Sequence, residues 1–193
     1  MTIRRRYVLK ALAASLGSAG AWPYLSDSAV ATFAAIQSTN APPRLVFLTP
    51  AQYATVDAVT ETILPSDDHS PGARAARVAD YIDLLLSESD ETTRKRWIDG
   101  VAALDKESRR RFQMVYADLS SDKATELLTA ISRNEFNPKN NLERFFAMTK
   151  AAAIRGHYTS EIGIHKELEY KGNQYLSEFV GCTHPEHGYV EGK

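Results

Sequence analysis

Cysteine is nearly absent from this sequence, because Cys182 is the one thiol among 193 residues. A single thiol excludes a disulfide within the chain. It also excludes an iron–sulfur cluster held by the usual four thiolates and covalent haem attachment through a C-x-x-C-H motif. Any structural disulfide of Cys182 must therefore join this chain to another chain.

Glycine-rich nucleotide-binding motifs are missing as well. None of the ten glycines forms a G-x-G-x-x-G turn, through which backbone amides approach the pyrophosphate in dinucleotide-binding folds. The sequence also has neither a Walker A motif nor a G-x-S-x-G nucleophile elbow. The usual signatures of nucleotide, dinucleotide and hydrolase sites are thus excluded.

The chain has little excess charge and no long hydrophobic run. Its formal net charge is −1, so it lacks the basic excess of nucleic-acid-binding proteins, and we expect no nucleic-acid partner. No apolar stretch approaches the roughly 20 residues that a membrane-spanning helix needs. A hydrophobic content of 44% in 193 residues predicts one compact globular domain with a proper core.

The first 31 residues are typical of an export signal. The segment RRYVLK, with Arg5 and Arg6 as the pair, looks like a twin-arginine signal. A weakly apolar Ala/Ser/Gly/Leu stretch follows, and Ala29-Val30-Ala31 forms a small-residue cleavage pattern. Two alternatives stay open, namely an ordinary secretory leader and a segment that is never cut and serves as an anchor.

The twin-arginine route carries folded proteins, chiefly those that receive a cofactor in the cytoplasm. This interpretation predicts the twin-arginine translocase as a partner during export and the periplasm as the destination. It also predicts a cofactor site in the mature chain, and none of the motifs above supplies one.

Helical periodicity dominates residues 49–156, and residues 32–48 are predicted to be a linker. Thr49 and Gln52 form a capping box around a helix that Pro65 stops. A second helix is predicted over residues 73–86, and Asn140 with Glu143 caps the last one. Three further helices are marked by apolar residues at helical spacing: Trp97, Ile98, Val101 and Leu104; Phe112, Val115, Tyr116 and Leu119; Leu127, Leu128 and Ile131. The pattern predicts an all-α bundle of about six helices.

Residues 157–193 form an irregular C-terminal arm with four tyrosines. Tyrosine provides a large contact area for little lost rotamer freedom, which favours a partner-docking segment. Packing of the arm on its own bundle is the alternative. Because exported proteins meet an oxidising compartment, we hypothesise that Cys182 in this arm forms a disulfide with a partner subunit.

Two clusters of polar residues deserve a chemical interpretation. Cys182, His184 and His187 are a sensible zinc or copper ligand set, but they share one loop, and a polar loop around a buried thiol is the simpler interpretation. Asp67, Asp68 and His69 could serve an enzyme, although adjacent loop residues seldom aim at one substrate atom. Solvated loop charge explains this second cluster.

Four segments together resemble a known family, the gluconate 2-dehydrogenase subunit 3 family. They are ILPSDDHSPGARAARVADYID, HYTSEIG, ELEYKGN and GCTHPEHGY, and they occur in this order. The resemblance implies a small subunit that partners a large FAD-dependent flavoprotein of the glucose-methanol-choline type. Such complexes oxidise sugars, polyols or sugar acids and pass electrons toward a cytochrome c or the quinone pool.

The resemblance also explains a twin-arginine leader on a chain without a cofactor motif. The flavoprotein binds FAD in the cytoplasm, docks on the small subunit and is carried out folded, so that the complex lies in the periplasm or is attached to the inner membrane. The resemblance implies no catalytic residue and no cofactor in this chain. The positions expected to contact the partner are Tyr158, Thr159, Glu161, Gly163, Tyr170, Gly172, Cys182, His184 and His187.

One departure from the family pattern is His157-Tyr158, where relatives often have two aromatic residues. The alternative function is a small metal- or haem-binding electron-transfer protein that uses Cys182, His184 and His187.

Overall fold

The computed structural model describes residues 25–39, 41–68, 70–170 and 172, and in these residues it contains helices and no strand. The all-α prediction is confirmed. The helices are α2 (Asp27–Gln37), α3 (Pro50–Ile63), α4 (Gly72–Ala75), α5 (Val78–Ser87), α6 (Glu91–Phe112), α7 (Ser121–Ser132) and α8 (Asn141–Tyr158). Two short turns complete the list, a 3₁₀ turn η1 (Tyr116–Asp118) and a π-helical turn η2 (Gly163–Glu167).

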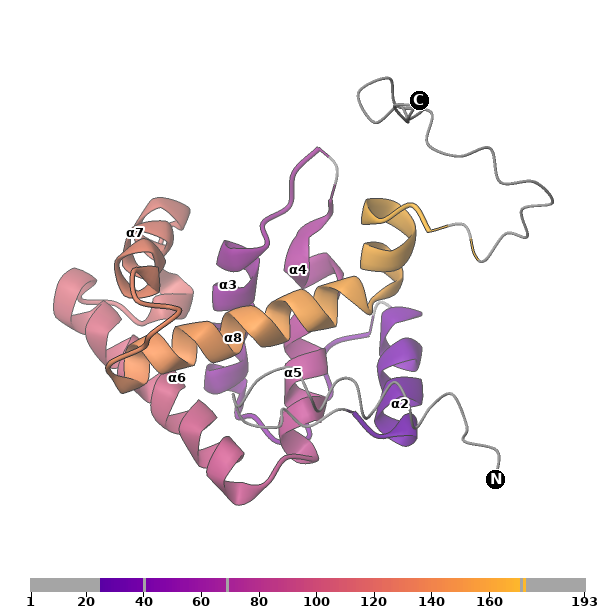
Figure 1. The fold of residues 1–193 in the computed structure, drawn as a ribbon, viewed down its shortest axis with the longest axis horizontal. Helices are drawn as coiled ribbons and strands as arrows, with labels where there is room; N and C mark the ends of the chain where they lie inside the picture. Colours follow the sequence, from indigo (N-terminus) through magenta and orange to yellow (C-terminus); the bar gives the residue numbers. More distant parts are fainter. Residues whose placement is uncertain (1–24, 40, 69, 171, 173–193) are drawn as a thin grey trace, which may run out of the picture.

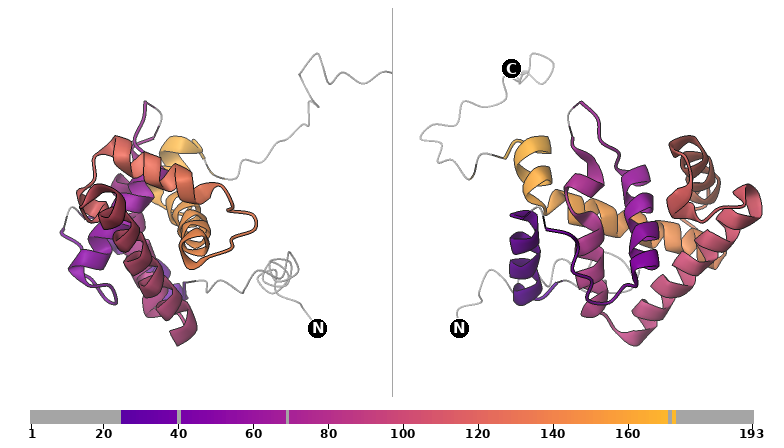
Figure 2. Two further views of the ribbon diagram at one scale, coloured as in Figure 1. Left: turned by 90° about the vertical axis from the view of Figure 1, so that its left-hand side faces the viewer. Right: turned by 180° about the vertical axis from the view of Figure 1, so that it is seen from behind.

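Helix α8 is the central element of the bundle. It runs across the middle of the molecule and contacts α3, α4, α5, α6, α7 and η2 (Figure 1). The view from behind in Figure 2 places α2 and α7 at opposite ends of the molecule. None of the helices in the described ranges is long and apolar enough to cross a membrane.

The predicted helix starts at Thr49 and Asn140 are confirmed. The hydroxyl of Thr49 accepts the N–H of Gln52, and the Gln52 side chain accepts the N–H of Thr49, so the capping box is complete. Asn140 Oδ1 accepts the N–H of Glu143 at 2.9 Å. Helix α3 ends at Ile63, just before Pro65, as expected from the missing N–H of proline.

The single helix predicted over residues 73–86 is wrong, because Arg77 separates α4 from α5. Arg77 has a left-handed backbone with φ of 57°, which costs on the order of 1–2 kcal/mol for a residue with a side chain. Its guanidinium donates to the carbonyl oxygen of Ala41 at 3.0 Å and to the buried carboxylate of Asp80 at 3.1 Å. These contacts with distant and buried groups offset the backbone strain.

The predicted fourth helix through Phe112 and Leu119 is also wrong. Helix α6 runs on to Phe112 and is followed by the C-cap residue Gln113, whose φ is 62°. A 3₁₀ turn follows, in which the Tyr116 N–H donates to the carboxylate of Asp105 at 3.0 Å. Of the four apolar residues, only Tyr116 is buried, at 1% exposed, whereas Phe112, Val115 and Leu119 are half-buried. A side chain from α6 replaces the helical hydrogen bond at Tyr116.

Helix α2 was not predicted, and it lies across the boundary between the predicted leader and linker. Ser26 caps it by accepting the N–H of Ala29 at 3.2 Å. Ala29 and Phe33 are buried, and the ring of Phe33 packs edge-on against Tyr81 of α5 at 5.3 Å between centroids. Thus α2 is part of the bundle.

Small residues let α8 approach its neighbours closely. Ala152 and Ala153 are buried, and a Cβ added at Gly156 would lie 2.8 Å from the Tyr81 ring on α5. Nearer the start of α8, Phe145 packs edge-on against Trp97 of α6 at 5.6 Å between ring centroids. These contacts fix α8 between α5 and α6.

Candidate functional site

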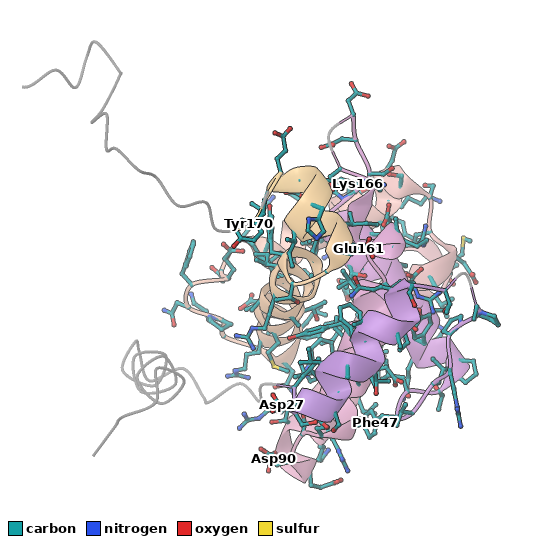
Figure 3. All side chains as sticks on the ribbon, turned by 90° about the vertical axis from the view of Figure 1, so that its right-hand side faces the viewer. Asp27, Phe47, Asp90, Glu161, Lys166 and Tyr170 are labelled. Carbon is teal, nitrogen blue, oxygen red and sulfur yellow. The ribbon has the colours of Figure 1, made fainter. Side chains whose placement is uncertain are left out.

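The structure brings three of the four segments named above together where α8 ends and the C-terminal arm begins, and the fourth, GCTHPEHGY, lies outside the described ranges. We define the junction as the residues His157, Tyr158, Ser160, Gly163 and Glu167 with Ser70 of the loop between α3 and α4. Ser70 belongs to the SDDHSPG segment, His157 to HYTSEIG, and Glu167 to the start of ELEYKGN. The η2 turn with Lys166 and the nearby Glu161 project from this end of the molecule (Figure 3).

Ser160 and Gly163 build the turn that ends α8. The Ser160 hydroxyl donates to the carbonyl oxygen of His157 at 2.5 Å and accepts the N–H of Gly163 at 3.0 Å. A Cβ at Gly163 would lie 2.1 Å from the His157 carbonyl oxygen. Only glycine therefore fits here, and the chain turns into the π-helical η2, a rare conformation that often occurs at functional sites.

Glu167 ties η2 back to α8. One carboxylate oxygen accepts the hydroxyl of Tyr158, and the other lies 2.5 Å from Nε2 of His157. The hydrogen bond from Tyr158 lowers the pKa of Glu167, and the contact with His157 adds to this effect. The same hydrogen bond raises the pKa of Tyr158, because ionised tyrosine could not donate to the carboxylate.

His157 is fully buried and faces both Glu167 and Ser70 with one ring nitrogen. Nε2 lies 2.5 Å from Glu167 Oε2 and 3.4 Å from Ser70 Oγ. A serine nucleophile needs histidine to contact serine through one nitrogen and the orienting carboxylate through the other. Nδ1 of His157 is buried and has no hydrogen-bond partner within the described part of the chain, so this arrangement does not match a hydrolytic triad.

The SDDHSPG loop is held by its own turn. Asp67 Oδ1 accepts the N–H of Ser70 at 2.7 Å, and the Asp67 N–H donates to the Ser70 carbonyl oxygen at 2.8 Å. Gly72 has φ of 81°, and a Cβ there would lie 2.6 Å from the Ser66 nitrogen. Asp67 and Asp68 are both exposed, and the Asp67 carboxylate shapes the loop that presents Ser70 to His157.

The predicted partner contacts divide into surface and buried positions. Thr159 and Glu161 are exposed, and Tyr170 is 48% exposed. Tyr158 is half-buried with its hydroxyl on Glu167. Gly163 is buried, whereas Gly172 is exposed.

Two exposed apolar side chains near the same end were missed from the sequence. Leu168 is 58% exposed and Ile154 is 41% exposed. Nothing in the sequence marks either side chain as exposed, so only the three-dimensional structure shows them at the surface.

Several predicted site residues lie outside the described ranges. They are the leader pair Arg5 and Arg6, the arm residues Cys182, His184 and His187, and the loop residue His69. Among the residues that the structure describes, no group of three His, Cys, Asp or Glu side chains is placed to hold a metal ion.

A shallow open hollow lies at the other end of the molecule. It is lined by α7 residues that include Thr125, Glu126 and Thr129, together with Arg111 of α6 and Arg133. Figure 1 places α7 far from η2, so the hollow adds nothing to the junction.

Comparison with known proteins gives one match. The family model described as gluconate 2-dehydrogenase subunit 3 matches residues 50–175, which is more than half of the chain. The matched range begins with α3 and includes the junction. Among curated proteins and among solved structures, nothing matches.

Proposed function

The chain belongs to the gluconate 2-dehydrogenase subunit 3 family, and from this premise we propose that it is the non-catalytic small subunit of a periplasmic FAD-dependent dehydrogenase complex. The large subunit would be a flavoprotein of the glucose-methanol-choline type that oxidises a sugar, polyol or sugar acid. A cytochrome c subunit or carrier would receive the electrons. This chain would escort the folded flavoprotein through the twin-arginine translocase and stabilise it.

The family match that spans both the bundle and the junction carries this proposal. The chemistry of the junction supports a structural role. Both oxygens of Glu167 are engaged, and His157 is buried against it. These groups set the direction in which the chain leaves α8, which is the task of a segment that presents an arm to a partner.

Exposed side chains at this end of the molecule support docking here. Thr159, Glu161 and Tyr170 are accessible, and the apolar Leu168 lies beside them in the chain. An exposed mixture of aromatic, aliphatic and polar groups suits the core and rim of a protein interface. Binding only the folded flavoprotein would raise its stability by mass action.

Co-purification tests the complex. We expect the affinity-tagged full chain, co-expressed with the neighbouring flavoprotein gene, to retain a large partner with flavin absorbance in stoichiometric amount. Replacing Tyr170 with Asp should weaken retention. The control Phe136→Ser, at a residue 96% exposed between α7 and the start of α8, should not. A tagged chain that purifies alone, or that is itself coloured or metal-loaded, would contradict the proposal.

Electrophoresis tests the proposed disulfide of Cys182. We expect the native complex to migrate as one covalent species without reductant and as two with it. Cys182→Ser should give two species under both conditions. Unchanged migration of the wild-type complex on reduction would show that Cys182 forms no bond to the partner.

A further inference from the structure

Helix α2 is integrated into the folded domain at both of its ends. At its start, Ser26 donates its backbone N–H to Glu88 at 2.7 Å and its hydroxyl to the same carboxylate at 2.5 Å. At its end, the Gln37 side chain accepts the N–H of Glu161 at 2.7 Å. Figure 3 shows α2 facing the viewer, with Asp27 at one end and Glu161 beyond the other.

Cleavage after Ala31 would remove the first half of this helix. The lost segment would include the cap at Ser26, its bonds to Glu88 and the buried Ala29, which is 5% exposed. The remaining residues would keep Phe33, 4% exposed, against Tyr81, but without the cap and the first turn of the helix. A helix shortened to about two turns has little stability of its own.

The export route makes this cut unfavourable for a second reason, which rests on the proposed function. A twin-arginine substrate is folded before it crosses, so a signal peptidase meets α2 already packed on α5. Proteolysis requires an extended and accessible backbone, which a packed helix offers only after local unfolding. A chain that arrived unfolded by the ordinary secretory route would not have this protection.

The sequence holds another small-residue pattern upstream of α2. Ala19-Gly20-Ala21 matches the A-x-A-like cleavage motif, and the weakly apolar residues 11–18 precede it. We propose that the leader is removed after Ala21, so that Trp22 becomes the N-terminus and α2 remains in the exported protein. Four residues, Trp22 to Leu25, lie between this cut and Ser26, so the cut precedes the cap of α2 in the chain.

Intact mass of the exported chain tests this assignment directly. We expect the tagged full chain, recovered from the periplasm together with its flavoprotein, to have lost residues 1–21. A chain that begins at Thr32, or one that is never cut, would overturn the proposal.

A pair of matched variants sharpens the test. Leucine at the residue before the cut blocks a peptidase that requires a small side chain there. Ala21→Leu should therefore accumulate the uncut precursor. Ala31→Leu should be processed as the wild type, because Ala31 lies exposed on α2. The reverse pattern would place the cut after Ala31.

Thermal melting separates this inference from the export proposal, because it needs no export. In the full chain, Phe33→Ala should lower the Tm by roughly 5–10 °C, since it empties a core position. The control Thr32→Ala changes an exposed neighbour and should leave the Tm nearly unchanged. Equal Tm values for the two variants would show that α2 is not packed and would overturn the inference. If Phe33→Ala lowers the Tm as expected but the chain never leaves the cytoplasm, the packing of α2 stands and the proposed export is contradicted.

Discussion

The side chain of Asp83 fixes the non-helical segment that precedes α3. It is 2% exposed, and its carboxylate accepts the N–H groups of Val46 at 2.6 Å, Phe47 at 3.0 Å and Leu48 at 2.6 Å. Hydrogen bonds to a charged acceptor are stronger than those between neutral groups. The carboxylate thereby positions the chain that enters α3.

Replacing Asp83 with Asn should destabilise the fold by about 2–4 kcal/mol, because the amide provides one oxygen for three donors and turns its own N–H₂ toward a donor. Urea unfolding followed by circular dichroism measures this change. Asp99→Asn, at a side chain 49% exposed in an ion pair with Lys95, should cost less than about 1 kcal/mol. Equal losses would contradict the role given to Asp83.

The backbone at position 163 leaves no room for a side chain at the junction. Gly163→Ala places a Cβ where the His157 carbonyl oxygen lies, so the turn must open, at a cost of about 1–3 kcal/mol. Glu161→Ala is the control, since Glu161 is exposed and contributes its backbone N–H to Gln37. Thermal unfolding of both variants tests this expectation. A Gly163→Ala protein as stable as the wild type would show that the turn is not as tight as described.

Glu167 should make the stability of the junction depend on pH. Its pKa in the folded protein lies below the ordinary value of 4.5. The ionised carboxylate therefore contributes its full stability above about pH 4.5, and this contribution is lost as the pH falls through the lower folded-state pKa. We expect Glu167→Gln to have a lower Tm than the wild type at pH 7, with the difference shrinking below pH 4.5. A difference that is constant with pH would contradict this.

At the scale of helices, the sequence predicts those features that neighbouring residues determine. Thr49 and Asn140 cap helices through groups three residues away, so a short motif contains all the information. The helical spacing of Leu127, Leu128 and Ile131 likewise predicts the buried face of α7, where all three are buried.

The features missed from the sequence depend on distant partners. The break at Arg77 relies on Ala41, 36 residues away, and the start of α2 relies on Glu88, 62 residues from Ser26. The candidate site also depends on residues that are distant in the sequence. Its segments were conspicuous in the sequence, but the meeting of Ser70 with His157 joins residues 87 apart, which no local pattern encodes.

The crossing of α6 and α8 offers a test of packing between elements. A Cβ at Gly100 of α6 would lie 2.3 Å from the Phe145 ring of α8. Gly100→Ala should therefore destabilise by about 1–3 kcal/mol from overpacking, although alanine favours the helix by about 1 kcal/mol.

The double variant with Phe145→Ala supplies the control for this crossing. Once the ring is removed, Gly100→Ala should become neutral or stabilising, because only the helix propensity remains. Unfolding free energies of the four proteins complete the cycle. A Gly100→Ala penalty that persists without the ring would show that the close contact is not its cause.

At the scale of the whole molecule, α8 connects the packing of the bundle to the junction. It packs against α3, α5 and α6, and its last turn carries His157 and Tyr158. Helix α2 braces the same end through Gln37 and Glu161. A rigid bundle that holds one end of the chain in a fixed direction fits a subunit that docks on a larger protein.

Export of the flavoprotein tests the central claim most directly. Dehydrogenase activity with bound flavin is measured in the periplasm and cytoplasm of cells that make the large subunit with this chain as wild type, as Arg5→Lys/Arg6→Lys, or as the control Arg4→Lys. We expect the double variant to leave active flavoprotein in the cytoplasm and none in the periplasm, while Arg4→Lys exports it normally. Equal periplasmic activity with all three chains would contradict the escort function.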